Sequence, residues 1–200
     1  MSLVRSFFEP TEIETREEEN KKTVYGYAAT FEKLSTPMYG IREKIRAGAF
    51  KTSLEKNNIR ALWSHKTDQV LGSTRSKTLR LSEDNKGLSF ELDLPDTAQG
   101  RDAFTLIKRK DVEGMSFGFN VNKEEWDQSD PKKIVRTLID VDLIEISITA
   151  FPAYPDTQVK ARSIEEEYLA YLETNKKIDV EKNIRALALL IDSLTIKSKE

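Results

Sequence analysis

The chain has 200 residues, and its 32 Lys and Arg against 34 Asp and Glu give a formal net charge of -2. This near balance argues against a nucleic-acid-binding protein, which usually carries a basic excess on one face. The absence of cysteine excludes disulfides, thiolate metal sites and cysteine nucleophiles. No apolar run approaches the roughly 20 residues of a membrane span, and the first residues lack the apolar region of a secretory signal, so we expect no membrane partner.

Short strands and few helices are predicted along the first part of the chain. The first 22 residues are polar and acidic and indicate a short strand or arm followed by a turn. Residues 23–31, TVYGYAATF, are rich in β-branched and aromatic residues and predict a strand. Further strands are predicted at 39–45, 59–65, 78–82 and 88–94, with a short helix at 49–56.

A central helix is predicted over residues 96–110, DTAQGRDAFTLIKRK, because its apolar side chains recur near one face. Asp96 or Thr97 can cap its start. Three strand-like runs follow, and the polar stretch EEWDQSD separates the first two. They cover residues 114–122, 134–139 and 141–151.

The character of the sequence changes after Arg162. The segments SIEEEYLAYLET and DVEKNIRALALLIDSLTIK have helical periodicity and contain neither glycine nor proline. We therefore expect an α+β fold with two parts, a mainly β-barrel domain over 1–162 and a helical tail over 163–200. The second tail helix has an apolar face that must bury against the body, a second copy or a scaffold. That face comprises Ile184, Leu187, Leu190, Ile191 and Leu194.

The stretch GMSFGF, residues 114–119, matches the G-x-S-x-G pattern of a hydrolase nucleophile at Ser116. In the α/β-hydrolase elbow this pattern joins a strand to a helix, and the histidine follows the serine in the chain. Neither condition holds here, because FGFNVN alternates like a strand and the single histidine, His65, precedes Ser116. The alternation instead places Met115 and Phe117 toward the core, and Ser116 lies between two glycines on the other face.

Two further residues complete a candidate relay with Ser116. In the third run, the carboxylate of Glu145 lies on a strand that otherwise looks buried, so it needs a partner. We predict the apolar face of this run at Ile144, Ile146 and Ile148, with Leu143 sharing the face of Glu145. His65 ends the predicted strand IRALWSH and is the natural partner of Glu145, which would allow the imidazole to act as the base that a serine nucleophile needs.

Each of these residues also has a structural interpretation. A serine between glycines is usually a turn or bulge residue, and a lone histidine is usually structural. Glu145 could pair with Arg136 or Lys133 instead of a histidine. Likewise, Asp140 and Asp142 share a face and could bind a metal, although solvated charges are the simpler interpretation.

At these positions the sequence resembles the prohead maturation proteases of tailed bacteriophages. The matching segments, in family order and spacing, are GYAATF, GAF at 48–50, LWSHKTDQVLGST at 62–74, KGLSFELDLPDTAQGRD at 86–102, GMSFGF, and LIEISITAFPAYPDTQVKAR at 143–162. The family is similar in fold to the herpesvirus maturation protease assemblin, a β-barrel flanked by helices with serine and histidine on barrel strands. The resemblance implies Ser116 as nucleophile and His65 as base, with Glu145 in the place of the second histidine of assemblin.

The resemblance implies a serine endopeptidase that cleaves capsid or scaffold proteins, and itself, during procapsid maturation. Its substrates would be the major capsid protein or the scaffold protein, with self-association as a further interaction. It would act in the host cytoplasm inside the assembling procapsid, without a metal or organic cofactor. The alternative is a catalytically inactive capsid or scaffold component with the same barrel fold.

Overall fold

The computed structural model describes residues 4–6, 13–18, 21–35, 37, 41–130, 133–150, 172–174 and 176. The chain divides into two units, Met1–Thr157 and Gln158–Glu200. In the second unit, residues 172–174 and 176 are helical, while the apolar stripe predicted over 184–194 lies outside the described residues. The predicted boundary at Arg162 stays a prediction. No helix in the described part of the chain is long and apolar enough to cross a membrane.

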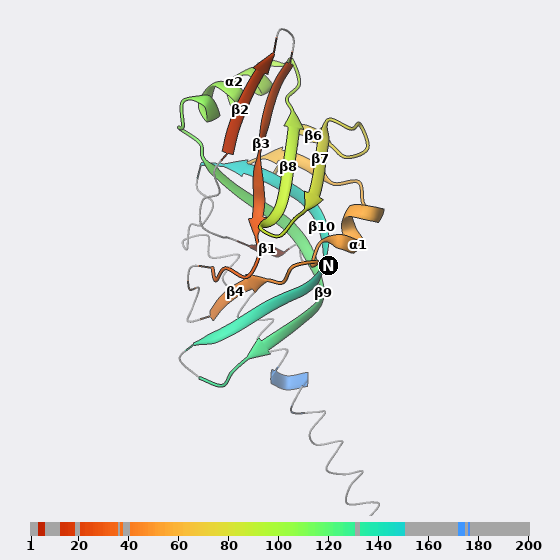
Figure 1. Ribbon diagram of the computed structural model, residues 1–200, viewed down its shortest axis with the longest axis vertical. Helices are drawn as coiled ribbons and strands as arrows, with labels where there is room; N and C mark the ends of the chain where they lie inside the picture. Colours follow the sequence, from red (N-terminus) through yellow and green to blue (C-terminus); the bar gives the residue numbers. More distant parts are fainter. Residues whose placement is uncertain are drawn as a thin grey trace, which may run out of the picture. The chain divides into compact units, whose positions relative to one another are not determined.

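Six strands form the first sheet of the larger unit, and a long antiparallel pair is its centre (Figure 1). This pair consists of β9 (Gly114–Asp127) and β10 (Ile134–Thr149). The sheet order is β1-β9-β10-β5-β6, with β4 also parallel to β10. The remaining bounds are β1 (Val4–Ser6), β4 (Ile41–Ile45), β5 (Arg60–Trp63) and β6 (Lys66–Ser73).

Four antiparallel strands form the second sheet, in the order β2-β3-β8-β7. Their bounds are β2 (Ile13–Glu18), β3 (Lys21–Thr30), β8 (Gly87–Asp93) and β7 (Leu79–Glu83). Figure 1 shows them side by side, with α2 beside β2. The prediction of a strand-rich α+β fold is confirmed. The expected closed barrel is wrong, because among the described strands no pairing joins the two sheets.

The core lies between these two sheets, since one continuous apolar cluster takes side chains from both. Phe117 and Phe119 of β9 are fully buried and lie 5.1 Å apart, ring centroid to centroid. Phe50 meets Phe117 edge to face at 5.5 Å. The predicted inward face of GMSFGF is therefore confirmed, and these rings fix β9 against the core.

Two helices flank the strands. The helix α1 (Lys51–Lys56) packs against β10, and α2 (Ala98–Lys108) begins after Thr97, whose hydroxyl accepts a hydrogen bond from the Gly100 N–H at 3.2 Å. Of the two predicted caps, Thr97 is therefore the one that the structure uses. The face of α2 that turns inward contains Ala103, Phe104 and Ile107.

The strands differ from the prediction in several places. The stretch EEWD was expected to interrupt the sheet, but it continues β9 to Asp127 because it pairs with the first half of β10. The two runs at 134–139 and 141–151 are one strand, β10, which passes through a bulge near Asp140. The strand β6 was not predicted, because its sequence, KTDQVLGS, is polar over its first half.

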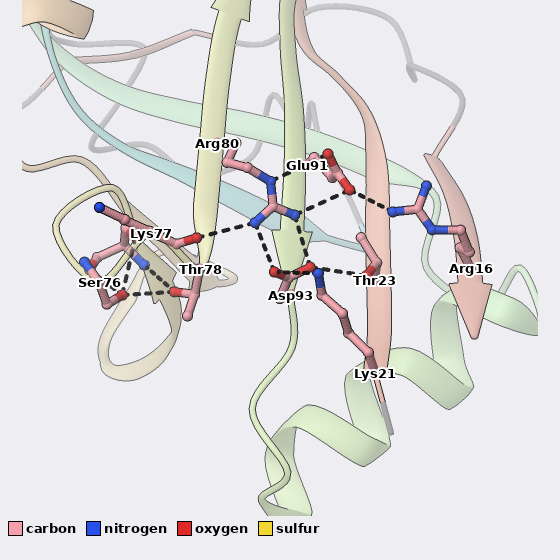
Figure 2. A network of polar contacts seen from close by, with 10 residues as sticks. Arg16, Lys21, Thr23, Ser76, Lys77, Thr78, Arg80, Glu91 and Asp93 are labelled. Atoms are coloured by element: carbon pink, nitrogen blue, oxygen red, sulfur yellow. Dashed lines mark hydrogen bonds and ion pairs between the residues drawn. The ribbon is translucent and has the colours of Figure 1, made fainter. Parts of the chain in front are cut away.

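A network of charged side chains covers the outer face of the second sheet (Figure 2). The Arg80 guanidinium donates two hydrogen bonds to the Asp93 carboxylate, at 2.7 and 2.9 Å, and also contacts Glu91 on the same neighbouring strand. Thr23 donates a further hydrogen bond to Asp93 at 3.0 Å. These contacts connect β7, β8 and β3, and the hydrogen bonds from Arg80 hold the pKa of Asp93 well below its ordinary value of 3.8.

This network predicts a pH-dependent loss of stability on substitution of Asp93. A carboxylate with a lowered pKa stabilises the fold fully above about pH 3.8, and this contribution is lost as the pH falls through the folded-state pKa. We expect Asp93→Asn to destabilise the protein at pH 7 by about 1 kcal/mol, since Arg80 is partly exposed. The difference in Tm from the wild type should shrink below about pH 3.8. Heat unfolding from pH 7 to pH 2 measures this, with exposed Asp68→Asn as control; a gap as large at pH 2 as at pH 7 would contradict it.

Candidate active site

The pairing of β9 with β10 brings the predicted site residues to one face of the first sheet. Ser116 is opposite Ser147, and Gly118 is opposite Glu145. Cross-strand neighbours of this kind have Cβ atoms roughly 5 Å apart. Ser116 is only 1% exposed and Ser147 is fully buried.

A bulge sets this register. Leu143 pairs with Phe119 and Glu145 with Gly118, so Ile144 is an extra residue on β10. The predicted alternation was wrong here, because the extra residue reverses it: Leu143 is fully buried in the core and Ile144 is only partly buried. Beyond the bulge, Ile146 and Ile148 face the core as predicted, and Glu145 shares the opposite face with Ser147.

His65 lies in a tight turn. It was predicted to end a strand, but β5 stops at Trp63, and Trp63 pairs with Lys66 across a two-residue loop. Both loop residues, Ser64 and His65, have positive φ, at 50° and 61°, which is the pattern of a type I′ hairpin turn. Such positions favour glycine. Backbone strain at a histidine there costs on the order of 1 kcal/mol, and strain of this kind is typical of functional sites. The Ser64 N–H donates to the Ile148 carbonyl at 2.9 Å, which holds the turn against β10.

The turn directs the imidazole at Glu145. His65 Nδ1 lies 2.7 Å from Glu145 Oε1, and the two side chains are 9% and 4% exposed. A carboxylate can only accept, so Nδ1 donates its N–H to Glu145, and in the neutral ring Nε2 then carries the lone pair. Within the described part of the chain, Nε2 is buried and has no hydrogen-bond partner, so Ser116 does not donate a hydrogen bond to it.

The alternatives for Glu145 and for the aspartates do not hold in this geometry. Arg136 pairs instead with Glu43 at 3.1 Å and Glu124 at 2.6 Å, and Lys133 lies 4.0 Å from Asp130. Asp142 accepts a hydrogen bond from the Asn57 amide at 2.6 Å. Over the residues described, no three histidine or acidic side chains gather to hold a metal.

Sequence reasoning missed Ser147. Its hydroxyl donates to Glu145 Oε2 at 2.6 Å and accepts the His65 backbone N–H at 3.0 Å. Both carboxylate oxygens of Glu145 are therefore engaged, one by the imidazole and one by Ser147. The available signal was its alternation with Glu145, two residues earlier on the same strand.

Comparison with known proteins places the chain in a family. It belongs to the caudovirus prohead serine proteases, whose family model matches residues 11–169. The prohead protease of Enterobacteria phage HK97 is 30% identical over 158 residues, which cover 77% of this chain. The chain spans 66% of the length of that relative. No solved structure matches.

Gly118 is the residue that leaves room for the carboxylate. A Cβ built on Gly118 would overlap Glu145 Oε1 and lie 3.1 Å from Cδ and Cγ. Because both strands are buried here, neither backbone can retreat easily.

We therefore expect Gly118→Ala to displace Glu145 and to destabilise the protein by about 1–3 kcal/mol. The double variant Gly118→Ala with Glu145→Ala is the matched control, since it removes the atoms that clash. Its Tm should lie above that expected from the sum of the two single effects. Strict additivity of the Tm changes in heat unfolding would contradict the assigned contact.

Ser147→Ala leaves a buried carboxylate oxygen and a buried N–H without their partner. We expect a loss of about 1–3 kcal/mol in the free energy of unfolding. Urea unfolding measures it, and Ser82→Ala, at an exposed position of β7, should cost less than about 0.5 kcal/mol. Equal effects of the two substitutions would show that the Ser147 contacts contribute nothing.

Proposed function

We propose that this protein is a serine endopeptidase of phage procapsid maturation, with Ser116 as nucleophile, His65 as general base and Glu145 as the acid that orients His65. The observation that supports it best is the 2.7 Å contact between His65 Nδ1 and Glu145 Oε1 beside the strand that carries Ser116. Membership in a family of prohead serine proteases points to the same chemistry.

The proposed reaction follows the ordinary course of a serine peptidase. Ser116 Oγ attacks the scissile carbonyl, and His65 Nε2 takes the hydroxyl proton as the C–O bond forms. The imidazolium then gives that proton to the leaving amine as the C–N bond breaks. Water, activated by the same nitrogen, hydrolyses the acyl-enzyme. Glu145 keeps the proton of the neutral ring on Nδ1 and stabilises the positive charge of the imidazolium.

The burial of His65 and Glu145 strengthens their interaction in this mechanism. Out of water, the carboxylate interacts more strongly with the imidazolium charge. Ser147 holds the other oxygen of the same carboxylate, so Glu145 cannot rotate away from the ring. The absent hydrogen bond between Ser116 and Nε2 does not count against the scheme, because such bonds are often long or misaligned without substrate.

We further propose that the substrates are the major capsid protein or the scaffold protein, and the chain itself, inside the assembling procapsid. The family and the HK97 relative are described by their prohead role, and this supports that substrate class. The tail over 163–200 would load the protease into the procapsid.

Substitution of the three residues tests the chemistry. With co-expressed major capsid protein, Ser116→Ala and His65→Ala should each lower cleavage by at least about 10⁴-fold, and the double variant should be little worse because the two act as a unit. Glu145→Gln should lose on the order of 10⁴-fold, since it leaves the imidazole in the wrong tautomer. Labelling by a fluorophosphonate probe should fall in the same three variants. It should be unchanged in the control variant Ser82→Ala, which replaces an exposed serine.

The result that would refute the scheme is capsid cleavage by Ser116→Ala at the wild-type rate. A folded wild-type protein without Ser116-dependent cleavage or labelling would instead favour the inactive capsid or scaffold component.

A further inference from the structure

The strand that carries Ser116 has two edges, and each is paired differently. One edge of β9 pairs with β10 along most of its length, and that pairing builds the site. The other edge pairs with β1, which has only three residues. The register is Val4 to Phe119, Arg5 to Gly118 and Ser6 to Phe117, antiparallel.

The position of β1 along β9 is the informative detail. Its last pair, Ser6 with Phe117, is directly beside Ser116. An extended backbone thus already runs antiparallel to the nucleophile strand, and its last described pair lies one residue from the nucleophile. Gly118, opposite Arg5, has no side chain, so it places no bulk on the site face of the sheet.

Ser116 cannot react in this arrangement. A scissile carbonyl must come within about 3–3.5 Å of Oγ, and the serine is 1% exposed. Some part of the protein must therefore move before a substrate enters. Peptides are commonly recognised by addition of an extended strand to a sheet edge, where the main chain provides the hydrogen bonds. The edge of β9 beside Ser116 offers such hydrogen bonds, and β1 uses them.

We propose that the edge of β9 at Phe117–Phe119 is the binding site for the extended backbone of the substrate, and that β1 occupies it in cis as a displaceable strand. This inference rests on the proposed peptidase function, because it names where the substrate binds. Its ligand is an extended peptide recognised through its main chain. Displacement of β1 then couples substrate binding to the opening of the site.

Proline variants of β1 test this in the full chain. Alternate N–H groups of a strand point toward its neighbour, so in Arg5→Pro/Ser6→Pro at least one lost N–H is a hydrogen bond to β9. The matched control, Arg5→Ala/Ser6→Ala, keeps both N–H groups. Both double variants are made in the Ser116→Ala background, so that no bound peptide is cut.

The probe is a fluorescein-labelled synthetic peptide, MSLVRSFF, with the sequence of residues 1–8. Its affinity, measured by fluorescence anisotropy, should be about tenfold higher for the proline variant than for the alanine control, if β1 pairs about nine tenths of the time. The same peptide N-methylated at Arg5 and Ser6 should not bind. With Ser116 intact, fluorophosphonate labelling should be faster in the proline variant than in the alanine control.

The outcomes separate the two hypotheses. Equal peptide binding by the proline and alanine variants would overturn the inference, whatever the enzyme does. A proline variant that has no folded state at the start of a heat scan would also overturn the inference. In that case β1 would be a required edge strand that protects the sheet from association. If no variant is labelled at Ser116 while the peptide still binds as expected, the proposed peptidase function fails and the binding edge stands.

Discussion

The register between β9 and β10 is the constraint on which the site depends. Each residue of the candidate site either lies on this pair or is held by it, because His65 is fixed through Ser147 of β10. A slip of one residue would turn Ser116 into the core and Phe117 toward the site. The burial of Phe117 and Phe119 opposes that slip, since exposing either ring would cost roughly 2–3 kcal/mol. The apolar core therefore positions the polar site.

The extra residue at Ile144 shows how packing and chemistry are reconciled on one strand. Before the bulge, Val141 and Leu143 face the core; after it, Ile146 and Ile148 do. Without the extra residue, the inward side of β10 would place Glu145 among the apolar side chains. A carboxylate there would have no partner and would cost several kcal/mol. The bulge instead gives Glu145 an imidazole on one oxygen and a hydroxyl on the other.

Much of this arrangement could be predicted from local sequence, and the rest could not. The alternation of GMSFGF predicted which side of β9 is buried, since a strand has a fixed period of two. The bulge was missed because it depends on pairing with β9, which is distant in the chain, whereas the turn at Ser64 and His65 was missed although its pairing partners are local. No glycine or asparagine marks the turn, and a polar strand such as β6 has no pattern of its own. Ser147 was missed for the same reason, because a serine gains its role only from what the fold brings beside it.

His65 is the only histidine in the chain, which has a practical consequence for spectroscopy. A proton nuclear magnetic resonance spectrum contains one set of imidazole ring signals, and these are assigned without any mutant. A proton held between Nδ1 and a carboxylate oxygen resonates far from the amide region, so its presence reports an intact contact with Glu145 in solution. The same single set of signals records any change at the ring when a peptide enters. The protonation of the site can thus be followed on the unmodified protein through the ring signals of this one histidine.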